Sequence, residues 1–200
     1  FYDLFARLKA VVDNMWAQID YPGDHTRKNT INQARVGMEG EILPELLVKL
    51  RVGAQFKDYH LSSRHNFNSW VGSAEIQYQM RKNLRFELGL NREPVEATFA
   101  DVNYYTEQGI RFRAEYTFRP QWVGYLEFGW YINDYQERAT IENRSGYRHD
   151  NHILAKPGFR YLFREWLEFE LSYQFLRRNS NFSFYSYGDN QVTFSSLLKY

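Results

Sequence analysis

The chain ends on the stretch QVTFSSLLKY, residues 191–200. Apolar or small side chains occupy every second position of this stretch, at Val192, Phe194, Ser196, Leu198 and Tyr200. A period of two is that of a β-strand, whose alternate side chains point to opposite faces of a sheet. Because an unpaired strand edge invites pairing with another strand, the stretch predicts a terminal strand with a neighbour in a closed sheet.

The same alternation recurs through the rest of the chain and predicts about eleven strands. They cover residues 2–12, 15–21, 34–42, 46–56, 70–80, 84–90, 110–118, 122–132, 153–163, 167–175 and 192–200. Asp13-Asn14 is interpreted as the turn between the first two. Tight turns alternate with polar loops, which are expected at residues 25–29, 60–68, 93–103, 136–150 and 177–190. No Asp, Glu, Lys or Arg occurs on the apolar face of these strands.

The composition excludes several classes of protein. Hydrophobic residues make up 44% and aromatic residues 18% of the 200 residues, yet the mean hydropathy is -0.64, which suits a surface that is apolar on one side and wet on the other. The formal net charge of +1 gives no argument for a nucleic-acid partner. Without cysteine, neither a disulfide nor a thiolate metal site can form. No run of about 18 apolar residues is present, which excludes a transmembrane helix.

Two folds fit the alternation: a transmembrane antiparallel up-and-down β-barrel, and a soluble sandwich or lipocalin-like barrel. Strands of about 10 to 15 residues exceed the usual five or six of globular proteins and suit a membrane span of about 9 to 11 residues with extensions. Short turns that alternate with longer loops are typical of outer-membrane barrels. We therefore predict an all-β barrel in the bacterial outer membrane, with residues 1–200 as one domain.

The number of expected strands bears on the size of the barrel, since single-chain bacterial barrels almost always have an even number. An odd count means that an odd number of strands is missing upstream, or that the weak second strand at residues 15–21 is misread. Asp3, Arg7 and Lys9 interrupt the first apolar segment, so it is no signal peptide. We expect the chain to be the C-terminal part of a barrel of about 16 to 18 strands, wide enough for an aqueous channel.

Residues 70–200 carry turn and strand motifs of a known family. These are Glu115-Tyr116-Thr117-Phe118-Arg119-Pro120-Gln121-Trp122, Asp134-Tyr135, Arg148-His149-Asp150, residues 161–166, Arg178-Asn179-Ser180-Asn181 and Tyr187-Gly188-Asp189-Asn190-Gln191-Val192. With them the chain resembles the putative β-barrel porin type 2 group, outer-membrane barrels often encoded with exopolysaccharide or capsule export systems. The resemblance implies an exported polysaccharide or oligosaccharide as cargo. The chain departs from the pattern by ending in Tyr instead of the commoner Phe, which a terminal aromatic signal should tolerate.

The apolar face of the terminal strand has a second expected role. We expect the barrel-assembly machinery to read it as a signal made of Val192, Phe194, Leu198 and Tyr200.

Charged side chains occupy the face opposite to the apolar one and are the candidate lumen-lining, selectivity-determining residues: Arg35, Glu39, Arg51, Glu75, Arg85, Glu87, Arg111, Arg113, Glu115, Arg160, Glu168 and Glu170. In one interpretation an arginine ladder faces a wall of glutamates, and the field between them selects solutes. In the other, cross-strand ion pairs only keep the lumen soluble. Tyr125 and Tyr131 could stack on sugar rings or belong to an aromatic girdle.

Candidate catalytic and metal-binding residues are few. His149-Asp150 has the composition of an acid–base pair, but no nucleophile or second carboxylate pair accompanies it, so a polar loop beside a strand explains it. His25, His60, His65 and His152 are scattered at loop ends, which does not favour a metal site. No Gly-rich phosphate loop is present. We predict no enzymatic activity, no metal and no cofactor.

Pro157 falls within the strand expected at residues 153–163. Proline has no backbone N–H and removes one hydrogen bond from a sheet. We expect a β-bulge or an unpaired site there.

Two functions from different classes remain open. The first is an outer-membrane channel that passes an exported polysaccharide or oligosaccharide through a charged lumen. The second is a structural scaffold barrel that sheathes or anchors a partner protein, such as a periplasmic protein, a lipoprotein or an electron-transfer protein. Expected partners are outer-membrane lipid and the barrel-assembly machinery, together with a glycan cargo in the first case or a protein in the second. No nucleic-acid partner is expected.

Overall fold

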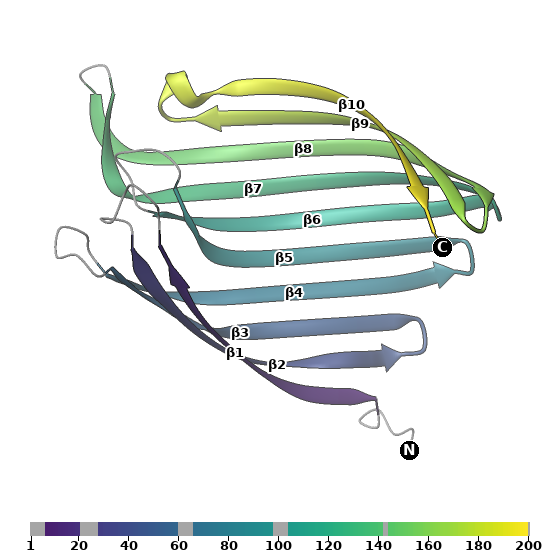
Figure 1. Ribbon diagram of the computed structural model, residues 1–200, viewed down its shortest axis with the longest axis horizontal. Coiled ribbons are helices and arrows are strands. Elements are labelled where there is room, and N and C mark those ends of the chain that lie inside the picture. Colours follow the sequence, from purple (N-terminus) through teal and green to yellow (C-terminus); the bar gives the residue numbers. More distant parts are fainter. Residues whose placement is uncertain (1–6, 21–27, 60–65, 98–103, 142–143, 200) are drawn as a thin grey trace.

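The structure is a computed structural model that describes residues 7–20, 28–59, 66–97, 104–141 and 144–199. Ten strands form one sheet, in which each strand is antiparallel to its neighbours in the sequence (Figure 1). They are β1 (Leu8–Ile19), β2 (Asn29–Leu43), β3 (Leu46–Tyr59), β4 (Phe67–Arg81), β5 (Leu84–Glu96), β6 (Tyr104–Arg119), β7 (Trp122–Ile141), β8 (Arg144–Arg164), β9 (Leu167–Ser180) and β10 (Tyr187–Leu198). A short 3-10 helix, η2 (Ser183–Tyr185), lies between β9 and β10. The predicted all-β, up-and-down topology is confirmed.

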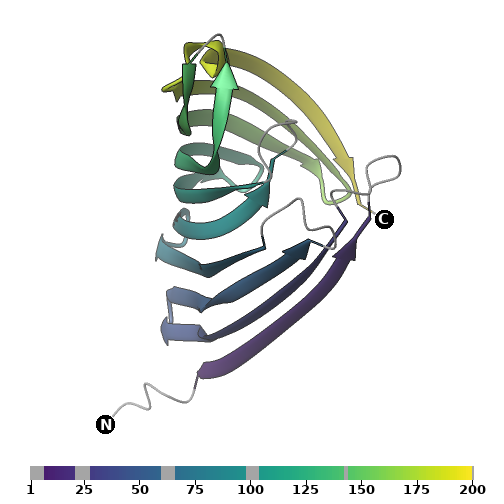
Figure 2. The same cartoon turned by 90° about the vertical axis from the view of Figure 1, so that its left-hand side faces the viewer.

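The sheet curves strongly, which gives it a concave and a convex face (Figure 2). β1 and β10 are its two edges, and no pairing joins them within the described residues, so the sheet is not closed. The tight turns β2–β3, β4–β5, β6–β7 and β8–β9 lie together at one end of the sheet, and the β9–β10 connection with η2 lies at the opposite end, which we call the loop end (Figure 1). β1 begins and β10 ends at the tight-turn end, as expected for an even number of strands.

The prediction of two strands before residue 21 is wrong. Asp13 and Asn14, interpreted as a turn, lie inside β1 and pair with Arg35 and Ala34 of β2. Asp13 accepts a hydrogen bond from Arg51 at 2.9 Å, so a polar side chain that looked like a turn signal is an ion-paired residue of the concave face. The described strands are therefore ten instead of eleven, and the argument from an odd count falls away.

Because β1 is one strand instead of two, the side chains that point outward from it also differ from the prediction. Met15, which was expected to continue the apolar face, shares the parity of Asp13. Trp16 is on the other face with Val12, and these two side chains are 62% and 78% exposed. The turn assumed at Asp13-Asn14 implied that the apolar face changes there from even-numbered to odd-numbered residues. In the structure the alternation of faces continues through β1 without a change.

Several strands extend further than the alternation predicted. β7 and β8 run through most of the loop expected at residues 136–150, with a register shift between Asp134 and Arg138. β9 and β10 shorten the loop expected at residues 177–190 to residues 181–186. The physical reason is that a strand outside the hydrocarbon layer can be polar on both faces, so its sequence loses the alternation that identifies a half-buried strand.

The two faces differ in composition and in exposure. The convex face carries the apolar residues, and large side chains such as Val52, Trp70 and Leu126 are more than half exposed. The concave face carries the charged ones, and its crowded side chains include Tyr125, which is only 6% exposed. A buried apolar cluster lies at the loop end, where Tyr105 packs against Tyr135, Ala97 and Ala139.

Pro157 creates an unpaired site, as predicted. It pairs with Leu126 of β7, whereas the ladder toward β9 passes from Ala155↔Phe175 directly to Gly158↔Ser172. The register is the same on both sides of the gap, so no bulge is present. The missing N–H of proline accounts for the gap.

Candidate functional site

The twelve predicted lumen-lining residues all lie on the concave face. The strand registers carry one set of side chains from Asp13 through Arg35 across the sheet, and all twelve belong to that set. The structure brings arginines and glutamates into contact across neighbouring strands. The cross-strand ion pairs of the second interpretation are therefore present, and a selecting field remains a prediction.

Glu115 of β6 is the centre of the ion-pair network on β5–β9. Its carboxylate contacts Arg85 at 3.5 Å, Arg113 at 3.3 Å and Arg160 of β8. Arg113 also contacts Glu127 at 3.3 Å. The side chain of Glu115 is 15% exposed, so the three guanidinium groups meet one partly buried carboxylate.

Other ion pairs of the concave face lie on both sides of this centre. Further ion pairs join Arg85 to Glu87 at 3.2 Å, Arg160 to Glu168 at 3.9 Å, Arg51 to Asp13 at 2.9 Å, Arg51 to Glu39 at 2.6 Å, Arg35 to Asp13 at 3.7 Å and Lys49 to Glu75 at 3.4 Å. Lys49, Asp13 and Glu127 were not among the predicted residues. Alternation alone would have identified Lys49 and Glu127, because each lies opposite the apolar face of its strand.

Tyr125 is fixed in place on three sides. Its hydroxyl donates a 2.5 Å hydrogen bond to Glu170, and the guanidinium of Arg113 lies 3.9 Å from its ring centre. Its ring covers Gly158, where a Cβ would come within 2.1 Å of it. Because both the face and the hydroxyl of Tyr125 are engaged, this residue supports the wall.

A basic groove of about 460 Å³ crosses the concave face over β2–β7. Its basic side chains are Arg35, Lys49, Arg51 and Arg111, and Glu75, Asn91 and Tyr131 also line it. Within the part of the chain that the structure describes, Arg111 is the basic residue of this groove for which no salt bridge is found. Tyr131 lies over Gly109 and Gly129, where a Cβ would clash with its ring, so two glycines make room for an aromatic wall.

A second cluster at the loop end was missed as a site in the sequence. Arg148 and Asp150 of β8 form a buried pair, with Nη2 of Arg148 2.5 Å from Oδ2 of Asp150 and exposures of 3% and 0%. Arg148 lies between two rings, 3.5 Å from the centre of Tyr185 and 4.3 Å from that of Tyr135. Arg178 approaches Asp150 at 3.7 Å and donates to the carbonyl of Tyr185 at 2.8 Å.

This cluster, which we call the loop-end cluster (Tyr135, Arg148, Asp150, Arg178 and Tyr185), holds η2 against the sheet. Burial raises the pKa of the Tyr135 phenol to about 12, so the ring faces Arg148 as a neutral group. Several of its members lie in the motifs that carry the family resemblance. These motifs are the sequence signal from which the cluster could have been found. The motifs therefore describe how one loop is anchored.

His149 and Asp150 do not form an acid–base pair. They are adjacent in β8 and point to opposite faces, and His149 Nδ1 lies 2.5 Å from Oδ1 of Asp134 on the convex face. Among the described residues, no group of three or more His, Asp or Glu side chains could hold a metal ion. His25, His60 and His65 lie outside the described residues.

The expected assembly signal lies on the convex face as far as the structure describes it. Val192, Phe194 and Leu198 pair with Tyr173, Leu171 and Leu167 of β9 and continue its apolar face. Tyr200 lies outside the described residues. In the described parts of the chain, no helix has the length and apolar character needed to cross a membrane.

A family model described as putative beta-barrel porin 2 matches residues 17–200. No curated protein matches the chain. Solved structures with a similar fold include OmpTdeltaL8, a loop L8 deletion mutant of the Vibrio cholerae outer membrane protein OmpT, with a TM-score of 0.54 and 11% identity over 94% of this chain and 58% of that one. In-vitro folded OmpT of Vibrio cholerae gives a TM-score of 0.53 and 12% identity over 84% and 50%. The chain thus spans about half the length of these structures, and at this identity the likeness concerns the fold alone.

Proposed function

Because the chain belongs to the putative beta-barrel porin 2 family, we propose that it builds the wall of an outer-membrane channel that passes a polysaccharide or oligosaccharide outward. Family membership and the barrel neighbours confirm the predicted family and the outer-membrane location. The polysaccharide or oligosaccharide cargo is our proposal. It is supported by the groove on the concave face, the face that becomes the lumen when such a sheet closes.

The basic groove carries the proposal because it combines the groups that a hydrated sugar needs. Tyr131 offers an aromatic wall for a sugar ring, and Asn91 offers an amide for hydroxyl groups. Arg111 adds a guanidinium that no carboxylate of the described residues neutralises, which favours a sugar that bears a carboxylate. The surrounding ion pairs hold the groove rigid without adding net charge. An acidic glycan is therefore the cargo that fits best.

Single-channel conductance of the whole protein in a planar lipid bilayer tests the proposal. We expect an oligogalacturonate to block the current at a lower concentration than a neutral maltooligosaccharide of equal length. Arg111→Gln should weaken the acidic block about tenfold, the loss of one charge-assisted contact. Arg119→Gln, the same change of charge at the tight-turn end, should leave the block unchanged.

Equal block by both sugars in the wild type would contradict selection by the groove. The scaffold function would be favoured instead if the native particle conducts no ions and contains a second protein inside the barrel.

A further inference from the structure

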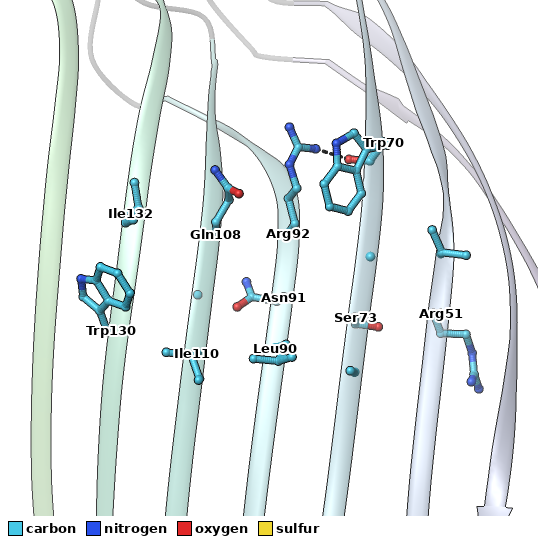
Figure 3. A pocket seen from close by; sticks show the side chains of 14 residues that line it. Arg51, Trp70, Ser73, Leu90, Asn91, Arg92, Gln108, Ile110, Trp130 and Ile132 are labelled. Carbon is cyan, nitrogen blue, oxygen red and sulfur yellow. Dashed lines mark hydrogen bonds between the residues drawn. The ribbon is translucent and has the colours of Figure 1, made fainter.

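The convex face contains an apolar groove that is independent of what passes through the lumen. The groove has a volume of about 520 Å³ and lies over β3–β7 in the loop-end half of the sheet (Figure 3). Its floor lies at Gly72 and Ala74 of β4, where Gly72 pairs with Val52 of β3 and Ala74 pairs with Leu90 of β5. Two small residues in succession on the outward face leave a hollow between taller neighbours.

The groove ends at the level where the outer face changes from apolar to polar. On β5 the outward residues are apolar from Leu84 to Leu90, and the next one is Arg92. On β6 the outward residue beyond Ile110 is Gln108, which pairs with Arg92. Arg92 and Gln108 thus lie at the boundary between hydrocarbon and headgroups. In outer-membrane barrels the longer loops are extracellular, so this boundary belongs to the outer leaflet.

Arg92 is held in position at the end of the groove. Its guanidinium carbon lies 4.1 Å above the ring of Trp70, and Nη1 donates to the carbonyl of Trp70 (Figure 3). Nη1 also donates to Ser69 Oγ at 3.0 Å. No salt bridge to Arg92 is found among the described residues, and these two hydrogen bonds use one of its two terminal nitrogens. A stacked guanidinium with free N–H groups matches the geometry of a phosphate oxygen pair.

We propose that the groove is a binding site for a phosphorylated glycolipid of the outer leaflet. One acyl chain lies in the hollow over Gly72 and Ala74, and a phosphate of the headgroup accepts hydrogen bonds from Arg92. The volume is within the range of small-molecule sites, and each buried methylene contributes to binding. The loop-end position selects the glycolipid of the outer leaflet over the phospholipids of the inner one.

Native mass spectrometry of the delipidated whole protein tests the site, with diphosphoryl lipid A as the probe. We expect one bound lipid per barrel in the wild type. Arg92→Gln should weaken binding about tenfold through loss of the phosphate contact. Ala74→Phe should weaken it as much, because the ring fills the hollow.

Two matched variants control for general effects. Arg177→Gln removes another exposed outward arginine, on β9, and Ala155→Phe places the same ring between Phe128 and Phe175 on the outer face of β8. Both should bind as the wild type does. The proposal is overturned if Arg92→Gln binds normally, if Arg177→Gln loses as much affinity as Arg92→Gln, or if phosphatidylglycerol binds as tightly as lipid A.

Discussion

Glu115 contacts three guanidinium groups, more than any other carboxylate of the described concave face. Glu115→Gln should lower the free energy of unfolding by about 1 to 3 kcal/mol, since it takes one carboxylate contact from each of three arginines, which then keep those with Glu87, Glu127 and Glu168. Glu87→Gln makes the same change of charge but removes a single, more exposed pair with Arg85, and should cost less than about 1 kcal/mol. Urea unfolding in lipid vesicles measures both values. Equal losses would show that Glu115 is no more than one ion pair among others.

Asp150 anchors the loop-end cluster. Asp150→Asn removes the charge of the buried carboxylate that Arg148 contacts, which should cost about 3 to 5 kcal/mol. We also expect faster hydrogen exchange and faster proteolytic cleavage at residues 181–186, because Arg148 and Arg178 hold the ring and the carbonyl of Tyr185. Asp134→Asn, in an exposed pair with His149, should change neither by a measurable amount. An ordered loop in Asp150→Asn would mean that aromatic packing alone anchors η2.

At this scale, alternation places a charged residue on a face but does not say which partner it meets. The concave position of Arg113 or Glu115 follows from the period of two. Their mutual contact follows from it as well, because both lie on one face of β6, two residues apart. The contacts of Glu115 with Arg85 of β5 and with Arg160 of β8 depend on how the strands are aligned, which no single-strand pattern contains. Arg148 and Asp150 were missed for a different reason. They lie beyond the apolar belt, where both faces are polar and the period of two disappears.

The ladder between β8 and β9 has a gap that one substitution should close. Pro157→Ala restores an N–H at the gap between Ala155↔Phe175 and Gly158↔Ser172, so the ladder to β9 should become continuous. We expect a gain of about 0.5 to 1.5 kcal/mol in the free energy of unfolding, the net value of one hydrogen bond. Slow hydrogen exchange of the new amide at position 157 would report this bond, since that N–H is its donor.

Pro94→Ala is the matched control for this change. Pro94 pairs with Thr106 of β6 but lies beyond the last pair that β5 makes with β4, Gly72↔Arg92. Its substitution should alter stability by less than about 0.5 kcal/mol. If Pro157→Ala is no more stabilising than Pro94→Ala, the gap in β8 has a cause other than the missing N–H.

The period of two predicts a strand wherever one of its faces is apolar and the other is polar. β3 and β6 were located to within a few residues of their centres for this reason. β1 was divided because Asp13 and Asn14 resemble a turn locally, and only the cross-strand arginines show that they continue the strand. Polar residues inside a membrane strand are ambiguous until the partner strand is known.

We expect both edges of the sheet to be paired in the membrane. β1 and β10 each have one neighbour among the described residues, and an open strand edge is not tolerated in hydrocarbon, where water cannot satisfy the backbone. We therefore expect the outward edges of both strands to be paired in the membrane-embedded protein. Hydrogen exchange in lipid should show amides of β1 and β10 protected as well as those of the interior strands β5 and β6. Rapid exchange along either edge would contradict closure.

The partner of these edges decides whether the channel proposal is physically possible. A closed barrel of about eight strands is just filled by its own side chains, and ten strands with long arginines inside would leave little room for a hydrated sugar. Passage of a glycan therefore requires further strands between β10 and β1, and we expect about 16 to 18 in all. Electron cryomicroscopy of the native particle counts them directly. A ten-stranded barrel would exclude glycan transport through the lumen and would leave the ion pairs of the concave face with a structural role.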